Sequence, residues 1–295
     1  MTDNDGSSKL ADQTTATTTQ GHALSGSNWL DAHYEAARES YEAAAHYADI
    51  QPGWKLLDAG AGGGSYLPLL STLVGSTGTL DAVDLAPENV AAIRRREAAN
   101  GFNCPVTAQT GSVTALPFDD SAFDAVWCAN VLQYLSDLEL STALDEFTRV
   151  VRPGGFVIIK DSDFSAALLG TNPRTFWHFV EAAQAHPQFG ALATAYLRTV
   201  RLPQLLRQRG IALIGRRTFT SEWRQPLRPV DRAYLESAIP IYAAIAADLA
   251  LPAEEQAFWR RVGDVETESG YLNSTDFYYR EAFAVFVGTK QIQKG

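Results

Sequence analysis

Two hydrophobic rhythms alternate through the middle of the chain. Short apolar runs with the length and residue types of buried strands occupy residues 54–58, 78–84, 105–109, 123–129 and 156–161. Patterns typical of helices lie between them, at residues 65–70, 87–100 and 138–151. Strands that alternate with helices imply right-handed crossovers and a mostly parallel sheet with helices on both faces. The pattern therefore predicts the α/β fold class, as a three-layer α/β/α sandwich.

The start of the chain divides into two parts. Residues 1–27 are dominated by Thr, Ser, Asp, Gln and Gly without a periodic apolar face, which predicts a disordered leader. Residues 28–50 combine helix formers with helically spaced aromatic side chains, and they predict an amphipathic helix that ends before Pro52. No secretory signal pattern opens the chain, and no apolar run reaches the roughly 20 residues of a membrane span. We therefore expect a cytoplasmic protein that does not span a membrane.

The later half of the chain has mainly helical patterns. Its two strand candidates are residues 211–218 and 282–287. We interpret residues 163–200 and 221–278 as a helical cap inserted around these last strands. The predicted domain as a whole spans residues 28–288.

Composition and charge narrow the range of partners. Hydrophobic residues make up 46% of the chain, which is enough to build a core. The formal net charge is −10, from 24 basic and 34 acidic residues, so a nucleic-acid partner is not expected. The two cysteines, Cys104 and Cys128, are too few for a disulfide framework, and we expect them to be reduced and buried. No His, Asp or Glu cluster has metal-ligand spacing, so no metal is predicted, and a homodimer is left open.

The stretch from Leu57 to Ser65 carries the clearest chemical signal. Its glycines directly follow a predicted strand, where they allow a sharp turn and close approach to a ligand, and the next helix offers free N–H groups to an anion. A dinucleotide-binding loop that starts at Gly60 needs a final Gly or Ala where this chain has Ser65. A P-loop is excluded because no Gly-Lys-Ser/Thr follows.

The stretch instead resembles the first motif of class I S-adenosylmethionine-dependent methyltransferases, D-x-G-x-G-x-G, through Asp58, Gly60, Gly62 and Gly64. Further resemblances follow in the family's order: Asp84 at the end of the second strand, and residues 111–118, 123–130 and 149–155. The most similar subgroup is the ubiquinone/menaquinone-biosynthesis type, methyltransferase type 11. The resemblance implies a Rossmann-like sheet of seven strands, five parallel and a final antiparallel pair.

The resemblance also implies the cofactor S-adenosyl-L-methionine and the residues that bind it. The predicted cofactor set is Tyr34, Asp58, Gly60, Ala61, Gly62, Asp84, Leu85, Ser112, Val113 and Asn130. In it, Asp58 holds the methionine end, Asp84 the ribose, Ser112 the adenine edge, and Asn130 the amino acid moiety. An alternative for Asp84 is to cap the helix that follows. Ser112 and Val113 depart from the family's Asp-Ala, so Ser112 offers the adenine only a weak hydrogen bond.

The methyl acceptor is less well marked. His33 and Asp161 are the catalytic candidates, since a histidine near a cleft titrates near neutral pH and Asp161 ends a strand. Asp163, Trp177 and His178 are the substrate-binding candidates. The alternatives are a structural His33, aspartates that only cap the next helix, and cap aromatics that only pack the helices together.

These observations predict methyl transfer to a small molecule, as O- or C-methylation of an apolar or aromatic acceptor such as a secondary metabolite or a quinone-like compound. Two alternatives stay open. One is a non-catalytic protein that binds S-adenosylmethionine, and the other is a nicotinamide-dependent oxidoreductase.

Overall fold

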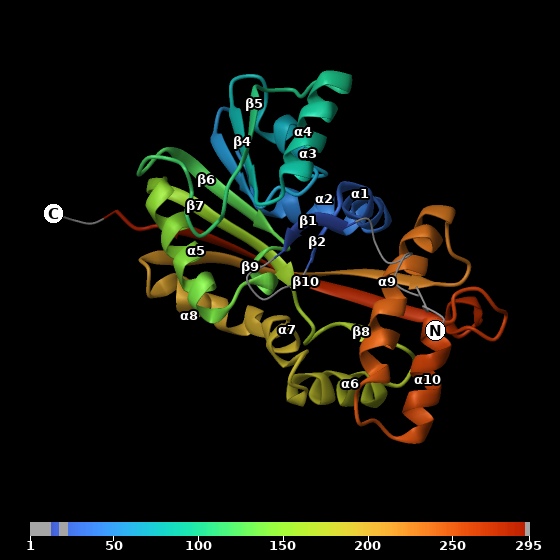
Figure 1. Ribbon diagram of the computed structural model, residues 1–295. Helices are drawn as coiled ribbons and strands as arrows, with labels where there is room; N and C mark the ends of the chain where they lie inside the picture. Colours follow the sequence, from blue (N-terminus) through green and yellow to red (C-terminus); the bar gives the residue numbers. More distant parts are fainter. Residues whose placement is uncertain (1–12, 18–22, 293–295) are drawn as a thin grey trace.

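The larger sheet in the described part of the chain has eight strands. The computed structural model describes residues 13–17 and 23–292 (Figure 1). The strand order is β5-β4-β3-β6-β7-β10-β8, and β9 pairs with the other edge of β10. The strands are β3 (Lys55–Ala59), β4 (Thr79–Asp84), β5 (Val106–Thr110), β6 (Phe123–Ala129), β7 (Val151–Ser162), β8 (Leu168–Leu169), β9 (Ile211–Arg224) and β10 (Tyr278–Lys290).

Five of these strands, β3, β4, β5, β6 and β7, are parallel, and β10 runs antiparallel to both β7 and β9. The predicted α/β fold class and the parallel sheet with a final antiparallel pair are confirmed. The eighth strand is the two-residue β8, which was not expected. The order reverses at β3, so the loop after β3 lies at the topological switch point where ligands of such sheets bind.

Helices cover both faces of the sheet because successive strand residues point to opposite sides. On one face Leu56, Trp127 and Ile158 pack with α2 (Arg38–Tyr47), α3 (Leu67–Val74) and α4 (Pro87–Asn100). On the other face Leu57 and Val126 pack with α5 (Asp137–Val150) and α8 (Leu202–Arg207). These helices lie on opposite sides of the strands in Figure 1. The three-layer arrangement follows directly from the alternation.

The entry segment forms two helices rather than one. They are α1 (Ser27–Ala36) and α2 (Arg38–Tyr47), and the chain leaves helical geometry at Ala37, with φ −100° and ψ 11°. Within the predicted disordered leader, the structure has two short strands, β1 (Gln13–Thr17) and β2 (Ala23–Ser25), which pair antiparallel. The other leader residues up to position 22 lie outside the described residues.

The cap lies beyond the end of the parallel strands (Figure 1). Its helices are α6 (Pro173–Ala185), α7 (Gly190–Ala195), α9 (Pro229–Ala247) and α10 (Ala253–Gly263), with short 3-10 turns η2 (Arg198–Arg201) and η3 (Tyr271–Asn273). The long strands β9 and β10 run from the sheet into the cap, so residues 221–224 belong to the sheet rather than to the cap segment predicted from 221. Residues 163–172 are turns and β8 rather than helix.

Two further expectations concern the whole chain. Cys104 and Cys128 are both buried and unpaired, as expected. Among the described residues, no helix is both long enough and apolar enough to cross a membrane.

Candidate functional site

A cavity of about 600 Å³ lies at the carboxyl ends of β3, β4 and β6, between the sheet, the helices α1 and α2, and the cap. All ten residues of the predicted cofactor set line it: Tyr34, Asp58, Gly60, Ala61, Gly62, Asp84, Leu85, Ser112, Val113 and Asn130. His33 lines it as well. Residues that are far apart in the sequence therefore meet around one space, while the role of each stays a prediction.

The loop after β3 approaches its neighbours so closely that glycine is required. Gly60 and Gly62 have positive φ angles of 85° and 54°. A Cβ on Gly60 would lie 2.3 Å from Val131 Cγ2, and one on Gly62 would lie 2.7 Å from Leu30 Cδ1. The Gly60 N–H donates to the carbonyl of Val83 at 2.8 Å, which ties the loop to β4. The loop thus forms a tight wall of the cavity, and α3 begins only after it, at Leu67.

Asp84 connects this loop to the start of α4. Its Oδ2 accepts the N–H of Gly62 at 2.8 Å, and its Oδ1 accepts Ala86 N–H at 2.9 Å and Asn89 Nδ2 at 3.1 Å. A carboxylate offers roughly four acceptor positions, so one remains for a ligand. Asp84 therefore already holds the helix start, and a two-hydroxyl contact with a ribose requires the bond from Gly62 to open.

Both acidic side chains of this wall are buried. Burial, and next the charge of Asp84, raises the pKa of Asp58 to about 8. Burial raises the pKa of Asp84 as well, against the hydrogen bonds from Ala86, Asn89 and Gly62. A ligand that brings a positive charge or several hydrogen-bond donors stabilises the ionised form of the two carboxyl groups and lowers their pKa values.

The predicted adenine end of the cavity has both apolar and polar side chains in its walls. Leu85 is 44% exposed there, although it is a large apolar side chain. Ser112 Oγ is engaged with Thr114, at 2.7 Å from its Oγ1 and 3.2 Å from its N–H. Within the described part of the chain, the buried Oδ1 of Asn89 has no hydrogen-bond partner. This end suits a flat ligand that covers Leu85 and carries a donor for Asn89.

A buried lysine lies beside Asn130. Lys160, near the end of β7, is 1% exposed, and its Nζ donates to Asn130 Oδ1 at 2.7 Å. The same Nζ lies 3.8 Å from the ring centroid of Tyr41 and 3.9 Å from that of Phe283. Burial lowers the pKa of Lys160 to about 7, against the charges of nearby carboxylates.

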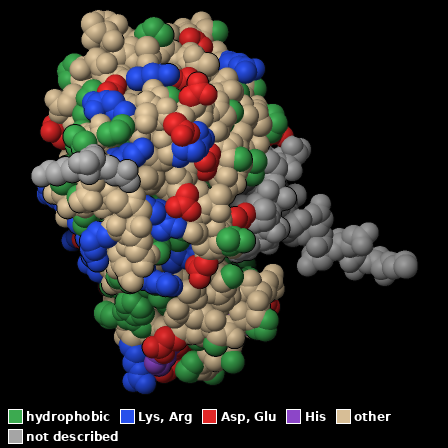
Figure 2. Space-filling model, turned by 90° about the vertical axis from the view of Figure 1, so that its left-hand side faces the viewer, with side chains coloured by type: hydrophobic (Ala, Val, Ile, Leu, Met, Phe, Trp, Pro, Cys, Tyr) green, Lys and Arg blue, Asp and Glu red, His purple; other side chains and the backbone are tan. Residues whose placement is uncertain are grey.

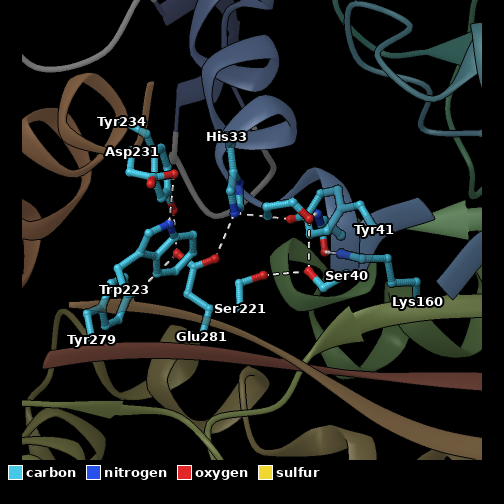
Figure 3. Close-up of polar contacts among 12 residues, drawn as sticks. His33, Ser40, Tyr41, Lys160, Ser221, Trp223, Asp231, Tyr234, Tyr279 and Glu281 are labelled. Carbon is cyan, nitrogen blue, oxygen red and sulfur yellow. Dashed lines mark hydrogen bonds and ion pairs between the residues drawn. The ribbon is translucent and has the colours of Figure 1, made fainter. Parts of the chain in front are cut away.

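His33 faces the half-buried Glu281 across the cavity wall (Figure 3). Its Nε2 lies 2.8 Å from Glu281 Oε2 and 3.1 Å from the Tyr41 hydroxyl, and Glu281 Oε1 accepts hydrogen bonds from the hydroxyls of Tyr234 and Tyr279. Burial alone raises the pKa of Glu281. The charge and hydrogen bond of His33, together with the hydrogen bonds from Tyr234 and Tyr279, bring this pKa below the usual value. An ionised Glu281 can only accept a hydrogen bond, so it favours the tautomer of His33 with the proton on Nε2. The lone pair of the imidazole is then on Nδ1.

Lys160 and Glu281 were not among the predicted site residues. A lysine within the apolar run 156–161 was a usable signal for Lys160. No local pattern marks Glu281, because only the register of β10 against β9, with Glu281 opposite Ser221, brings it to His33. Long-range strand pairing of this kind cannot be read from one sequence.

The predicted catalytic Asp161 is not among the described residues that line the cavity. Lys160 and Ser162 line it, so Asp161 between them faces the opposite side of β7. Its carboxyl group is buried, which raises its pKa to about 7. Asp163 is also buried, and its Oδ1 accepts the N–H and hydroxyl of Ser165, which caps the turn after β7. Strand alternation and turn capping thus account for both aspartates.

The predicted substrate residues Trp177 and His178 lie on α6, away from the main cavity. Trp177 packs at the edge of Phe176, with ring centroids 6.4 Å apart. His178 lines a separate cavity of about 370 Å³ between α6 and α10, where its Nδ1 lies 2.7 Å from Glu255 Oε1. The structure therefore does not bring either residue to the predicted cofactor set.

The cap half of the main cavity is apolar. Its lining includes Phe164, Phe179, Phe189, Tyr196, Ile241 and Ile245. The rings of Phe164 and Tyr196 stack at 4.2 Å. Some aromatic side chains of the cap thus line the cavity, and others pack the helices together.

The charges of the surface are mixed. On the face shown in Figure 2, basic and acidic side chains are interspersed. Among the described residues, no group of three or more His, Cys, Asp and Glu side chains is placed to hold a metal ion.

Comparison with known proteins gives sequence matches over part of the chain. Residues 57–159 match the family model described as a methyltransferase domain, type 11. Demethylmenaquinone methyltransferase of Shouchella clausii is 33% identical over 110 residues, 37% of this chain and 46% of that protein. Malonyl-[acyl-carrier protein] O-methyltransferase of Erwinia billingiae is 36% identical over 118 residues, 40% of this chain and 42% of that protein. The chain thus spans less than half the length of these relatives.

A solved structure extends the similarity of the fold to most of the chain. A putative methyltransferase from Bacillus halodurans has a TM-score of 0.54 at 17% identity, over 84% of this chain and 97% of that one. That identity shows the fold alone, whereas the match to the family model covers the Gly-rich loop and the strands that follow it. Residues 57–159 of this chain therefore match a methyltransferase domain of type 11 in sequence, within a fold that the chain shares with a structure described as a putative methyltransferase.

Proposed function

We propose that the protein transfers a methyl group from S-adenosylmethionine to a small, largely apolar molecule. The observation that carries the proposal is the convergence of the predicted cofactor set on one cavity at the switch point of the sheet. S-adenosylmethionine, when bound, supplies an activated methyl group on a sulfonium, so the protein mainly has to bind and align the reactants.

The residues present fit this cofactor. The Gly-rich loop leaves no space for a Cβ at Gly60 or Gly62, so its backbone can lie close to a ligand. Asp84 keeps one acceptor position. The Oδ1 of Asn89 has no hydrogen-bond partner among the described residues and can accept from a donor on the ligand. Asp58, whose pKa is raised by burial, suits the ammonium group of the methionine moiety. A nicotinamide cofactor is disfavoured because Ser65 stands where a dinucleotide loop needs Gly or Ala.

His33 is the proposed general base. Glu281 holds the Nε2–H of His33 at 2.8 Å, so Nδ1 has the lone pair that can take a proton from an acceptor hydroxyl. A base is needed only when the attacking atom carries a proton, so the His33–Glu281 pair favours O-methylation of a hydroxyl. The apolar cap half of the cavity fits the body of such an acceptor, aromatic or quinone-like.

Transfer of a labelled methyl group tests the proposal. The protein is incubated with methyl-deuterated S-adenosylmethionine and a panel of phenols, quinols and bacterial metabolite extract, and products are analysed by mass spectrometry. We expect a labelled product with the wild type and with His46→Gln, which alters an exposed histidine on α2, and at least a hundredfold less with His33→Gln, since general bases contribute roughly that factor or more. Binding of S-adenosylhomocysteine without any labelled product would favour the non-catalytic alternative.

The predictions about cellular location and oligomeric state stay open to test. A cytoplasmic location and a homodimer are proposals that fractionation and sedimentation measurements address.

A further inference from the structure

We propose that Lys160 is a positioning residue that, through Asn130, turns the hydroxyl proton of Tyr41 into the cavity, where it binds the carboxylate of S-adenosylmethionine. The inference rests on the proposed function, because it concerns the same cofactor. It follows from counting donors and acceptors along one hydrogen-bonded chain (Figure 3).

The first step is the orientation of the Asn130 amide. A charged lysine can only donate hydrogen bonds, so the atom of Asn130 that faces Lys160 Nζ at 2.7 Å must be the oxygen. The amide nitrogen then faces the Tyr41 hydroxyl at 3.1 Å and donates to it. Asn130 is further held by its own N–H, which donates to the Lys160 carbonyl at 2.8 Å. Lys160 thus decides which end of the amide Tyr41 meets.

The second step is the protonation of His33. Its Nε2 lies 2.8 Å from Glu281 Oε2, and an ionised glutamate requires a proton on that nitrogen. The same Nε2 lies 3.1 Å from the Tyr41 hydroxyl. That single proton is directed at Glu281, so Nε2 has no lone pair with which to accept a hydrogen bond from Tyr41, and Asn130 offers Tyr41 only an N–H group.

The third step concerns the proton of Tyr41 itself. Neither the amide nitrogen of Asn130 nor the protonated Nε2 of His33 can accept a hydrogen bond, so the O–H of Tyr41 has to point to another acceptor. Burial raises the pKa of Tyr41 well above its usual value, so the hydroxyl keeps its proton. Tyr41 lines the cavity together with Asn130 and Lys160, so a bound ligand can supply that acceptor.

The charge around Tyr41 indicates what the acceptor is. The ammonium of Lys160 lies 3.8 Å from the Tyr41 ring and adds positive charge beside the free O–H. Such a pair favours an anionic oxygen. The carboxylate is the anionic group of S-adenosylmethionine, and Asn130 lies where the amino acid moiety is expected. A methionine side chain at position 160 would fill similar volume without this desolvation cost, which argues for a role beyond packing.

Calorimetry with two ligands tests the proposal. S-adenosylhomocysteine carries the carboxylate, and 5′-methylthioadenosine has the same nucleoside without the amino acid. The titrations are made at pH 6, below the pKa of about 7 that burial gives Lys160, with Lys160→Met, Tyr41→Phe and the double variant. Lys55→Met is the matched control, because Lys55 also lies over an aromatic ring, Phe123, but outside the cavity.

We expect each single variant to weaken S-adenosylhomocysteine binding about tenfold, as for one charge-assisted hydrogen bond. Binding of 5′-methylthioadenosine should change less than twofold, and the double variant should bind no worse than Tyr41→Phe alone, since Lys160 acts through Tyr41. Equal losses for both ligands, or additive losses, would show a merely structural role and overturn the proposal.

Two other outcomes are also decisive. Should Lys160→Met fail to fold, Tyr41→Phe alone decides: unchanged S-adenosylhomocysteine affinity contradicts the proposal. Absence of any binding by the wild type would instead contradict the proposed function itself.

Discussion

Asp58 lies at the end of β3 with its carboxyl group turned into the cavity and buried from water. At pH 7 it is mostly protonated, because burial raises its pKa to about 8. A cationic ligand favours the ionised form, so binding lowers this pKa and expels the proton. The protonation state of Asp58 therefore changes with the charge of the ligand group that binds beside it.

The first prediction uses this proton. When S-adenosylhomocysteine binds at pH 7, the wild type should release up to about one proton more than Asp58→Asn, which has none to lose at this position. Calorimetry in buffers of different ionisation enthalpy measures the difference. Equal proton release from the two proteins would show that Asp58 does not contact the ammonium group.

Lys160 provides a second prediction, on stability. Its folded-state pKa of about 7 lies below the usual value of 10.5, so between these pH values the unfolded chain binds more protons than the folded one. The free energy of unfolding of the wild type should then rise with pH relative to Lys160→Met, by at most about 1.4 kcal/mol per pH unit from about pH 7 to pH 10. Denaturant titrations at several pH values measure this slope. Parallel curves for wild type and Lys160→Met would contradict the lowered pKa.

Single residues also mark the limit of what the sequence could predict. Asp58 and Asp84 lie at the ends of strands and the glycines directly follow one, so local order along the chain was enough to bring them to one edge of the sheet. Glu281 lies 248 positions from His33, and only the folded β10 joins them. Asp161 was misplaced because the alternation of β7 points Lys160, not Asp161, into the cavity.

The loop after β3 is the element on which the site depends most. Gly60 combines a positive φ of 85° with a neighbour, Val131, that leaves no space for a Cβ. Gly101 has a similar φ of 65°, but nothing lies within 4 Å of a Cβ there. A Cβ at Gly101 would meet backbone strain alone, whereas a Cβ at Gly60 would meet both strain and crowding, so comparing the two positions separates these effects.

We therefore predict that Gly60→Ala and Gly101→Ala differ in kind. Gly101→Ala should cost about 1 kcal/mol of stability from strain alone and leave S-adenosylhomocysteine affinity unchanged. Gly60→Ala should cost about 2–4 kcal/mol, because crowding adds to strain, and should weaken binding at least tenfold. Thermal unfolding and calorimetry measure both. An unchanged affinity for Gly60→Ala would show that the loop is only a turn.

Regular elements were predictable to different degrees. Helix α4 and strand β6 have the bounds that their patterns gave, 87–100 and 123–129, because each is a complete run with clear ends. The cap was predictable only as helical character. Strands β9 and β10 extend well beyond their apolar centres, since cross-strand pairing rather than hydrophobicity carries them into the cap.

At the scale of the whole molecule, two cavities lie in different places. The larger joins the sheet to the cap, while the smaller lies between α6 and α10 and contains His178. The first of these holds the whole predicted cofactor set, so binding and transfer should depend on it alone.

This separation gives a prediction for His178→Ala. Loss of the histidine leaves Glu255, 6% exposed, without its ion-pair partner, so the variant should lose about 1–3 kcal/mol of stability. Its affinity for S-adenosylhomocysteine and its methyl transfer should stay within twofold of the wild type. A large loss of transfer in a folded His178→Ala protein would restore His178 as a substrate residue.

The most direct test of the account is a calorimetric titration of S-adenosylhomocysteine into the wild type and Asp84→Asn. Asp84 ties the Gly-rich loop to α4 and keeps one acceptor position toward the cavity. The account predicts one binding site per chain in the wild type and an affinity at least tenfold lower in Asp84→Asn, which loses a charged acceptor. No binding by the wild type, or equal affinity for both proteins, would contradict it.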